Sequence, residues 1–134
     1  MKQKKLLFPA CLLIVVIIFV IVFAPKVIGS KPFAKLSEND ISAVTVRLLP
    51  PDQTAQVVDI KEFVDVLNEV VIYEKDDSFT EYEGQAVIYT ITRNDGTETV
   101  VQAYNPFIII DGVGYKTKYE PCERLSHIAN RLIK

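Results

Sequence analysis

The sequence predicts an α+β protein, in which an N-terminal transmembrane helix precedes one small domain with an antiparallel sheet and two helices on one face. Residues 6–24 carry no charged side chain, several later segments alternate apolar and polar residues between Asn/Asp-Gly turns, and two segments place apolar residues at helical spacing. A period of two is typical of strands, and spacings of three and four are typical of amphipathic helices. The expected order is β-β-α-β-β-β-β-β-α, and runs of strands between helices favour the α+β class.

The uncharged run at residues 6–24 predicts a transmembrane signal anchor. At a rise of about 1.5 Å per residue, the run is about 28 Å long, close to the thickness of a bilayer's hydrocarbon core. Lysines flank it almost equally on both sides, and a short N-terminus is easily left inside. The expected location is therefore the cell membrane, single-pass, with the N-terminus in the cytoplasm. A cleaved signal peptide and a lipid anchor are the alternatives.

The rest of the chain divides around this anchor. Residues 1–5 are expected in the cytoplasm, residues 25–35 form a basic linker with glycine, serine and proline, and residues 36–134 form one extracytoplasmic α+β domain. About 100 residues suffice for one small core and not for two.

The first half of the domain predicts two strands, a helix and a third strand. Alternation at residues 44–48 indicates a strand that ends at Pro50-Pro51, and residues 56–58 indicate a short return strand. Asp59, with Glu62 three positions later, is typical of a helix N-terminus, so we expect a helix over residues 60–70. Residues 71–73 continue as a strand, and residues 74–84 form an acidic loop.

The second half predicts two hairpins and a closing helix. Asn94-Asp95-Gly96 separates strands at 87–91 and 99–104, and Asp111-Gly112 separates strands at 107–110 and 113–118. Asp-Gly between apolar runs is a strong hairpin signal. Pro121 suits the first turn of a helix in which Leu125, Ile128, Ala129 and Leu132 share one face.

Charge and cysteine content narrow the function classes. From residue 36 onward, nine basic residues stand against all 17 acidic ones, a net charge of −8. Phosphate backbones repel such a surface, so no nucleic-acid partner is expected. Cys11 and Cys122 cannot meet if the anchor spans a membrane, and Cys122 is expected to be a small buried side chain.

Catalytic and metal-binding patterns are weak. Cys122 and His127 lie about 140° apart on one helix, so they cannot act as nucleophile and base, and we expect no enzyme. The densest group of oxygen ligands does not have the spacing of an EF-hand, so it provides weak metal-ligand candidates only. These candidates are Glu74, Asp76, Asp77, Glu81 and Glu83. No cofactor is expected.

Tyrosine content points instead to binding. The chain has six tyrosines, and strand propensity accounts for those in the alternating segments. Tyr82 lies in the acidic loop and Tyr119 precedes the last helix, so these two are the candidates for a partner-binding surface.

The segment from Ala86 onward resembles small membrane-tethered or lipoprotein-type domains of unknown function from Gram-positive bacteria. The shared pattern is a strand, an Asn/Asp-Gly turn, a strand, then Ile110-Asp111-Gly112 with Tyr115, and a short helix. The chain departs from the lipoprotein form because no cysteine follows its apolar run. The resemblance implies no catalytic residues.

These observations together predict a membrane-anchored, extracytoplasmic, non-enzymatic binding or accessory module. Its expected partners are the membrane, through residues 6–24, and a protein or cell-wall component. The alternative is a calcium- or small-ligand-responsive sensor that uses the acidic loop at residues 74–83.

Overall fold

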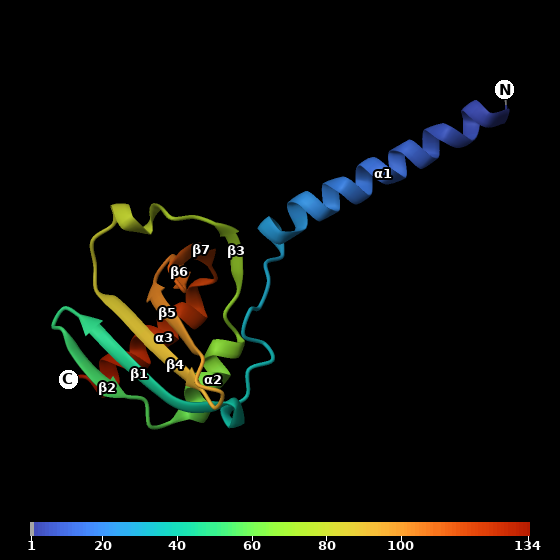
Figure 1. Cartoon of the computed structure of the whole chain (residues 1–134). Helices are drawn as coiled ribbons and strands as arrows, with labels where there is room; N and C mark the ends of the chain where they lie inside the picture. The colour runs from blue at the N-terminus through green and yellow to red at the C-terminus, as the bar shows by residue number, and fades with distance from the viewer. Residues whose placement is uncertain (1) are drawn as a thin grey trace.

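The structure is a computed structural model that describes residues 2–134, with the side chains of the first helix described over residues 9–22. This helix, α1 (Lys2–Val27), projects away from a small domain that contains all the strands (Figure 1).

The predicted transmembrane anchor is not supported. Within the described part of the chain, no helix combines the length and the apolar character that crossing a membrane requires. The side chains described in α1, at residues 9–22, are apolar and exposed. The signal anchor at residues 6–24 and the single-pass location in the cell membrane are therefore corrected.

The domain is a seven-stranded antiparallel sheet with the strand order β2-β1-β4-β5-β6-β7-β3. The α+β class is confirmed, and the strands and helices of the domain follow the predicted order. The strands are β1 (Ile41–Leu49), β2 (Gln53–Gln56), β3 (Ile72–Lys75), β4 (Ala86–Arg93), β5 (Glu98–Tyr104), β6 (Phe107–Ile110) and β7 (Val113–Thr117).

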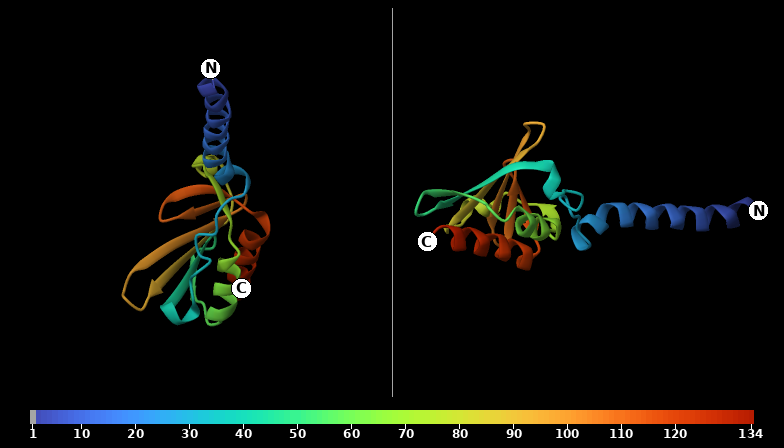
Figure 2. Two further views of the ribbon diagram at one scale, coloured as in Figure 1. Left: turned by 90° about the vertical axis from the view of Figure 1, so that its right-hand side faces the viewer. Right: turned by 90° about the horizontal axis from the view of Figure 1, so that it is seen from below.

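Two helices, α2 (Ile60–Asn68) and α3 (Tyr119–Leu132), lie on one face of the sheet (Figure 2). Asp59 caps α2 as predicted, because its side chain accepts a hydrogen bond from the Glu62 N–H at 3.0 Å. The core lies between these layers. Phe63 packs on Tyr89 with ring centroids 4.7 Å apart, and the Tyr89 hydroxyl donates to the Leu125 carbonyl at 2.5 Å. Burial raises the pKa of Tyr89 above its ordinary value.

The acidic segment after β3 covers part of the other face. It includes a short 3-10 helix, η2 (Ser78–Glu81), and Phe79 lies over Gly114 of β7. The Asp76 N–H donates to the Gly114 carbonyl at 2.9 Å, and the Gly114 N–H donates to Asp77 Oδ1 at 3.0 Å. A Cβ at Gly114 would lie 2.7 Å from the Phe79 ring, so this close approach requires glycine.

Part of the predicted linker at residues 25–35 is attached to the domain. Ser30 forms a two-hydrogen-bond bridge with Ile72 of β3, and Phe33 is only 6% exposed. The Asn68 side chain donates to the carbonyls of Phe33, at 2.5 Å, and Leu36, at 3.0 Å. A second short 3-10 helix, η1 (Glu38–Asp40), then leads into β1. The packed unit therefore begins before residue 36.

Candidate functional site

The two tyrosines predicted to contact a partner come to the same end of the sheet. Tyr82 is 59% exposed and lines a hollow of about 320 Å³ between the acidic segment, the β5–β6 turn and α3. Tyr119, 63% exposed, begins α3 beside the same turn. We call this region the tyrosine hollow; its lining residues are Tyr82, Glu83, Gly84, Gln85, Val87, Ala103, Tyr104, Asn105, Glu123 and Ser126.

Tyr82 is held by packing. Its backbone N–H donates to the Phe79 carbonyl at 3.2 Å, which ends η2, and its ring packs on Phe107 with centroids 5.6 Å apart. Phe107 is 4% exposed and fixed in β6. The chain then passes Tyr104 at Gly84, where a Cβ would lie 3.1 Å from the tyrosine hydroxyl oxygen. The exposed ring of Tyr82 is thus placed by a rigid strand and not by the loop alone.

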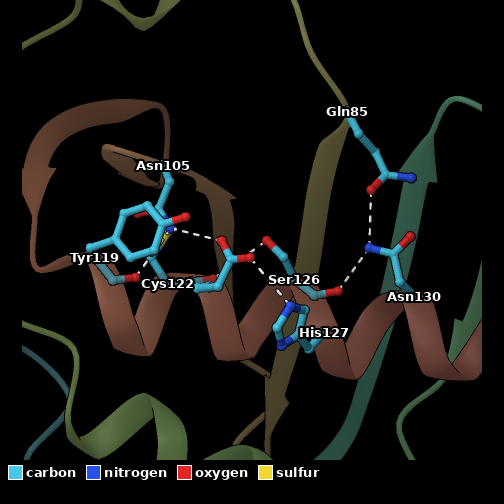
Figure 3. Close-up of polar contacts among 8 residues, drawn as sticks. Gln85, Asn105, Tyr119, Cys122, Ser126, His127 and Asn130 are labelled. Carbon is cyan, nitrogen blue, oxygen red and sulfur yellow. Dashed lines mark hydrogen bonds and ion pairs between the residues drawn. The ribbon is translucent and has the colours of Figure 1, made fainter.

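Asn105 joins this side of the hollow to α3. Its Nδ2 donates to the Tyr119 carbonyl at 3.1 Å and to Glu123 Oε2 at 3.2 Å (Figure 3). Its Oδ1 is buried and has no hydrogen-bond partner among the residues that the structure describes. A buried acceptor without a partner costs about 1–3 kcal/mol.

One face of α3 carries a row of polar groups, of which Glu123 and Ser126 line the hollow. Tyr119, Glu123, Ser126 and Asn130 recur at spacings of three and four, so they share this face. The Asn130 side chain donates to Gln85 Oε1 at 3.0 Å and to the Ser126 carbonyl at 2.8 Å (Figure 3). These contacts connect the segment after Tyr82 to the helix.

Cys122 and His127 are separated, as their spacing predicts. Cys122 is buried, its Sγ donates to the Phe107 carbonyl at 3.5 Å, and burial raises the pKa of the thiol to about 12. His127 pairs with Glu123, Nε2 to Oε1 at 3.2 Å, and its side chain is 71% exposed. The Ser126 hydroxyl donates to the Cys122 carbonyl at 3.4 Å. This arrangement offers hydrogen-bonding groups at a surface rather than an activated nucleophile.

Three of the weak metal-ligand candidates, Glu74, Asp76 and Asp77, have structural contacts of their own, and Glu81 is the last residue of η2. Glu74 pairs with Lys116 at 3.1 Å, and Asp77 accepts from the Gly114 N–H. Asp76 accepts from the Ser78 N–H at 2.9 Å, and these contacts with Ser78, with Lys116 nearby, lower the pKa of Asp76. Over the described residues, no three His, Cys, Asp or Glu side chains gather in a metal-binding group. Glu83 lines the tyrosine hollow instead.

Sequence reasoning selected Tyr82 and Tyr119 but missed Asn105 and Glu123, which line the hollow with Tyr82. Asn105-Pro106 marks a turn between two strands, and Glu123 lies four residues after Tyr119 on a predicted helix. The helical spacing places Glu123 near Tyr119, but the turn signal alone does not place Asn105 there. The proximity of Tyr82 depends on the strand order, which no local pattern encodes.

The geometry defines a small α+β domain with a preformed polar and aromatic surface hollow. Comparison of this chain with protein families, with curated proteins and with solved structures found no match. The resemblance to small tethered or lipoprotein-type domains stays a prediction.

Proposed function

We propose that this protein is a non-enzymatic binding module that engages a protein partner through the tyrosine hollow. One observation carries the proposal. Tyr82 and Tyr119 are 37 positions apart in the chain, but both contact the β5–β6 turn and the start of β6. The Tyr82 ring packs on Phe107, and the Tyr119 backbone carbonyl accepts a hydrogen bond from Asn105.

The side-chain chemistry of the hollow suits protein recognition. A tyrosine offers a large apolar ring and a hydroxyl at a small entropic cost, which is why tyrosine is enriched among residues that dominate binding energy. The Tyr82 ring is already packed on Phe107, so less ordering of this side chain is needed on association.

The polar groups favour a partner with hydrogen-bond donors and positive charge. The carboxylates of Glu83 and Glu123 line the hollow and can accept hydrogen bonds. A lysine or arginine side chain supplies both the donor and the opposite charge.

The test is site-specific photo-crosslinking with the full-length chain in the cells from which the gene comes. A photoreactive phenylalanine analogue replaces Tyr82 or Tyr119, and a matched control places it at Asp95, an exposed position at the opposite end of the β4–β5 hairpin. We expect positions 82 and 119 to crosslink to the same protein and position 95 to give no such product. Equal products at all three positions, or none at 82 and 119, would overturn the proposal.

A second measurement gives the magnitude. Tyr82→Ala and Tyr119→Ala are each expected to weaken partner binding about tenfold, whereas Tyr73→Ala, on the far edge strand, leaves it within about twofold. Thermal unfolding of the three variants serves as the folding control.

A further inference from the structure

The outer edge of β2 is an open strand edge beside a groove. Register pairs Thr45 with Gln56 and Val46 with Ala55, and the Val57 N–H donates to the Val44 carbonyl at 2.9 Å. Because successive residues of a strand direct their N–H and C=O groups to opposite sides, Ala55 faces β1, and Thr54 and Gln56 face outward. In the described part of the chain, no strand pairs with β2 on that outer side.

We propose that this edge binds an extended segment of a partner protein, which adds to the sheet as an antiparallel strand beside β2. This is a second interaction surface, independent of the tyrosine hollow. Only another backbone presents donors and acceptors at the spacing of an open edge, so the occupant is an extended peptide. Every existing pair in the sheet is antiparallel, which favours the same direction for the added strand.

The groove offers a place for the side chains of that segment. Its volume is about 680 Å³, and it lies between the chain that follows β2 and the last turn of α3. Its apolar lining includes Val57, Val58, Ile128 and Leu132, of which Val58 is 84% exposed. Figures 1 and 2 both show the end of α3 next to β2 on the helix-covered side. Alternate side chains of an added strand point to this side, so apolar residues at every second position would reach it.

The charges at the rim favour a basic segment. Arg131 pairs with Glu62 at 2.7 Å, and Lys61 pairs with Asp65 at 2.9 Å. Glu38 and Asp59, which also line the groove, add two carboxylates to these paired charges. A lysine or arginine beside the apolar residues of the segment would complement them.

A second copy of this chain fits less well. Antiparallel pairing of two β2 strands would turn Gln53 and Ala55 of each copy toward the helix-covered side, because Leu48 and Val46, their partners in β1, are buried there. A glutamine and an alanine provide too little apolar volume for the groove. A partner with larger apolar residues at alternate positions is therefore the better occupant.

The experiment measures binding of labelled peptides to the full-length chain. The probes have the sequence Lys-Thr-X-Thr-X-Thr-Lys, where X is Val, Leu, Ile or Phe. In antiparallel pairing with Thr54 and Gln56, the threonine N–H groups of the peptide bond to β2 and the X N–H groups face solvent. Methylation of the threonine nitrogens should weaken binding at least tenfold, and methylation of the X nitrogens should change it less than about threefold.

Variants of the protein test the same edge from the other side of the contact. Thr54→Pro removes an outward N–H, Thr54→Ala keeps it, and Val58→Asp places a charge in the groove at an exposed position. We expect Thr54→Pro and Val58→Asp to weaken binding about tenfold, and Thr54→Ala to bind as the unaltered chain does. Circular dichroism and thermal unfolding confirm that each variant is folded.

Three binding results would overturn the proposal. These are no binding by any probe up to about 1 mM, equal binding of the two methylated peptides, and unchanged binding by Thr54→Pro. Concentration-dependent dimerisation that Thr54→Pro abolishes would also overturn it, because it would assign the edge to a second copy of the chain.

Discussion

The two outer edges of the sheet differ in how they are protected. β3 is bridged by Ser30, which exchanges hydrogen bonds of 2.9 and 2.8 Å with Ile72, and β3 ends in Lys75. β2 has no such cover among the described residues, and its four residues carry no lysine or proline. An exposed edge can pair with other chains, and proteins usually cover or charge it. Of the two edges, β2 is therefore the one that is open to pairing with another chain. Because β2 has only four residues, unspecific pairing is limited.

The largest expected loss of stability comes from a substitution in the segment that covers the β3 edge. Phe33→Ala should destabilise the domain by about 3–4 kcal/mol, because a phenylalanine that is 6% exposed leaves a cavity in the core. Ile28→Ala is the control, because Ile28 is 75% exposed and its removal should change the free energy of unfolding by less than about 0.5 kcal/mol. Urea unfolding measures both. Equal effects would show that the segment is a linker and that the β3 edge is open too.

The next effect tests how Ser30 reaches β3. Gly29 has φ +74°, and a Cβ there would lie 2.5 Å from Val71 Cγ1 and 2.8 Å from the Ile72 carbonyl. Gly29→Ala should cost about 3 kcal/mol, because backbone strain and this collision add. Gly96→Ala has a similar φ, +86°, with nothing within 4 Å, so it should cost only about 1 kcal/mol. Thermal unfolding compares them, and equal costs would contradict the close contact with β3.

The smallest expected loss of stability distinguishes the N–H groups of β2 that face β1 from those that face outward. Ala55→Pro should cost about 2–3 kcal/mol, because it removes an N–H that bonds to β1 and leaves a carbonyl without a donor. Thr54→Pro should stay within about 0.5 kcal/mol, because its N–H faces outward. Chemical unfolding of both variants is the measurement. The reverse order would show that the register assigned to the open edge is wrong.

Local patterns predicted the elements of the domain, and the differences have local causes. β2 was expected at residues 56–58 but spans Gln53–Gln56, because the turn after β1 is tight, with Asp52 at φ 66° and its N–H donating to the Leu48 carbonyl at 2.8 Å. The predicted helix over 60–70 ends at Asn68, where the Glu69 N–H bonds to the Val66 carbonyl. Alternation and helical spacing identify an element well but not its last residue.

Features that depend on distant contacts were missed. Residues 25–35 were predicted to be a linker because they contain glycine, serine and proline. That composition gives no sign that one of them, Phe33, is buried in the domain. The acidic segment was predicted to be a loop, but Phe79 packs over Gly114 of β7 and Tyr82 packs on Phe107 of β6. Tyr82 and Tyr119 were each predicted as binding residues, but their common position follows from the strand order. The membrane anchor was predicted from the length and uncharged character of residues 6–24, and the described residues do not support it.

Amide hydrogen exchange of the full-length chain, read residue by residue by NMR, tests most directly that one edge is open and the other closed. We expect the N–H groups of Thr54 and Gln56 to exchange at nearly unprotected rates, and those of Ala55, Val57 and Ile72 to be strongly protected. Protection of Thr54 and Gln56 equal to that of Ala55, or rapid exchange at Ile72, would contradict this account.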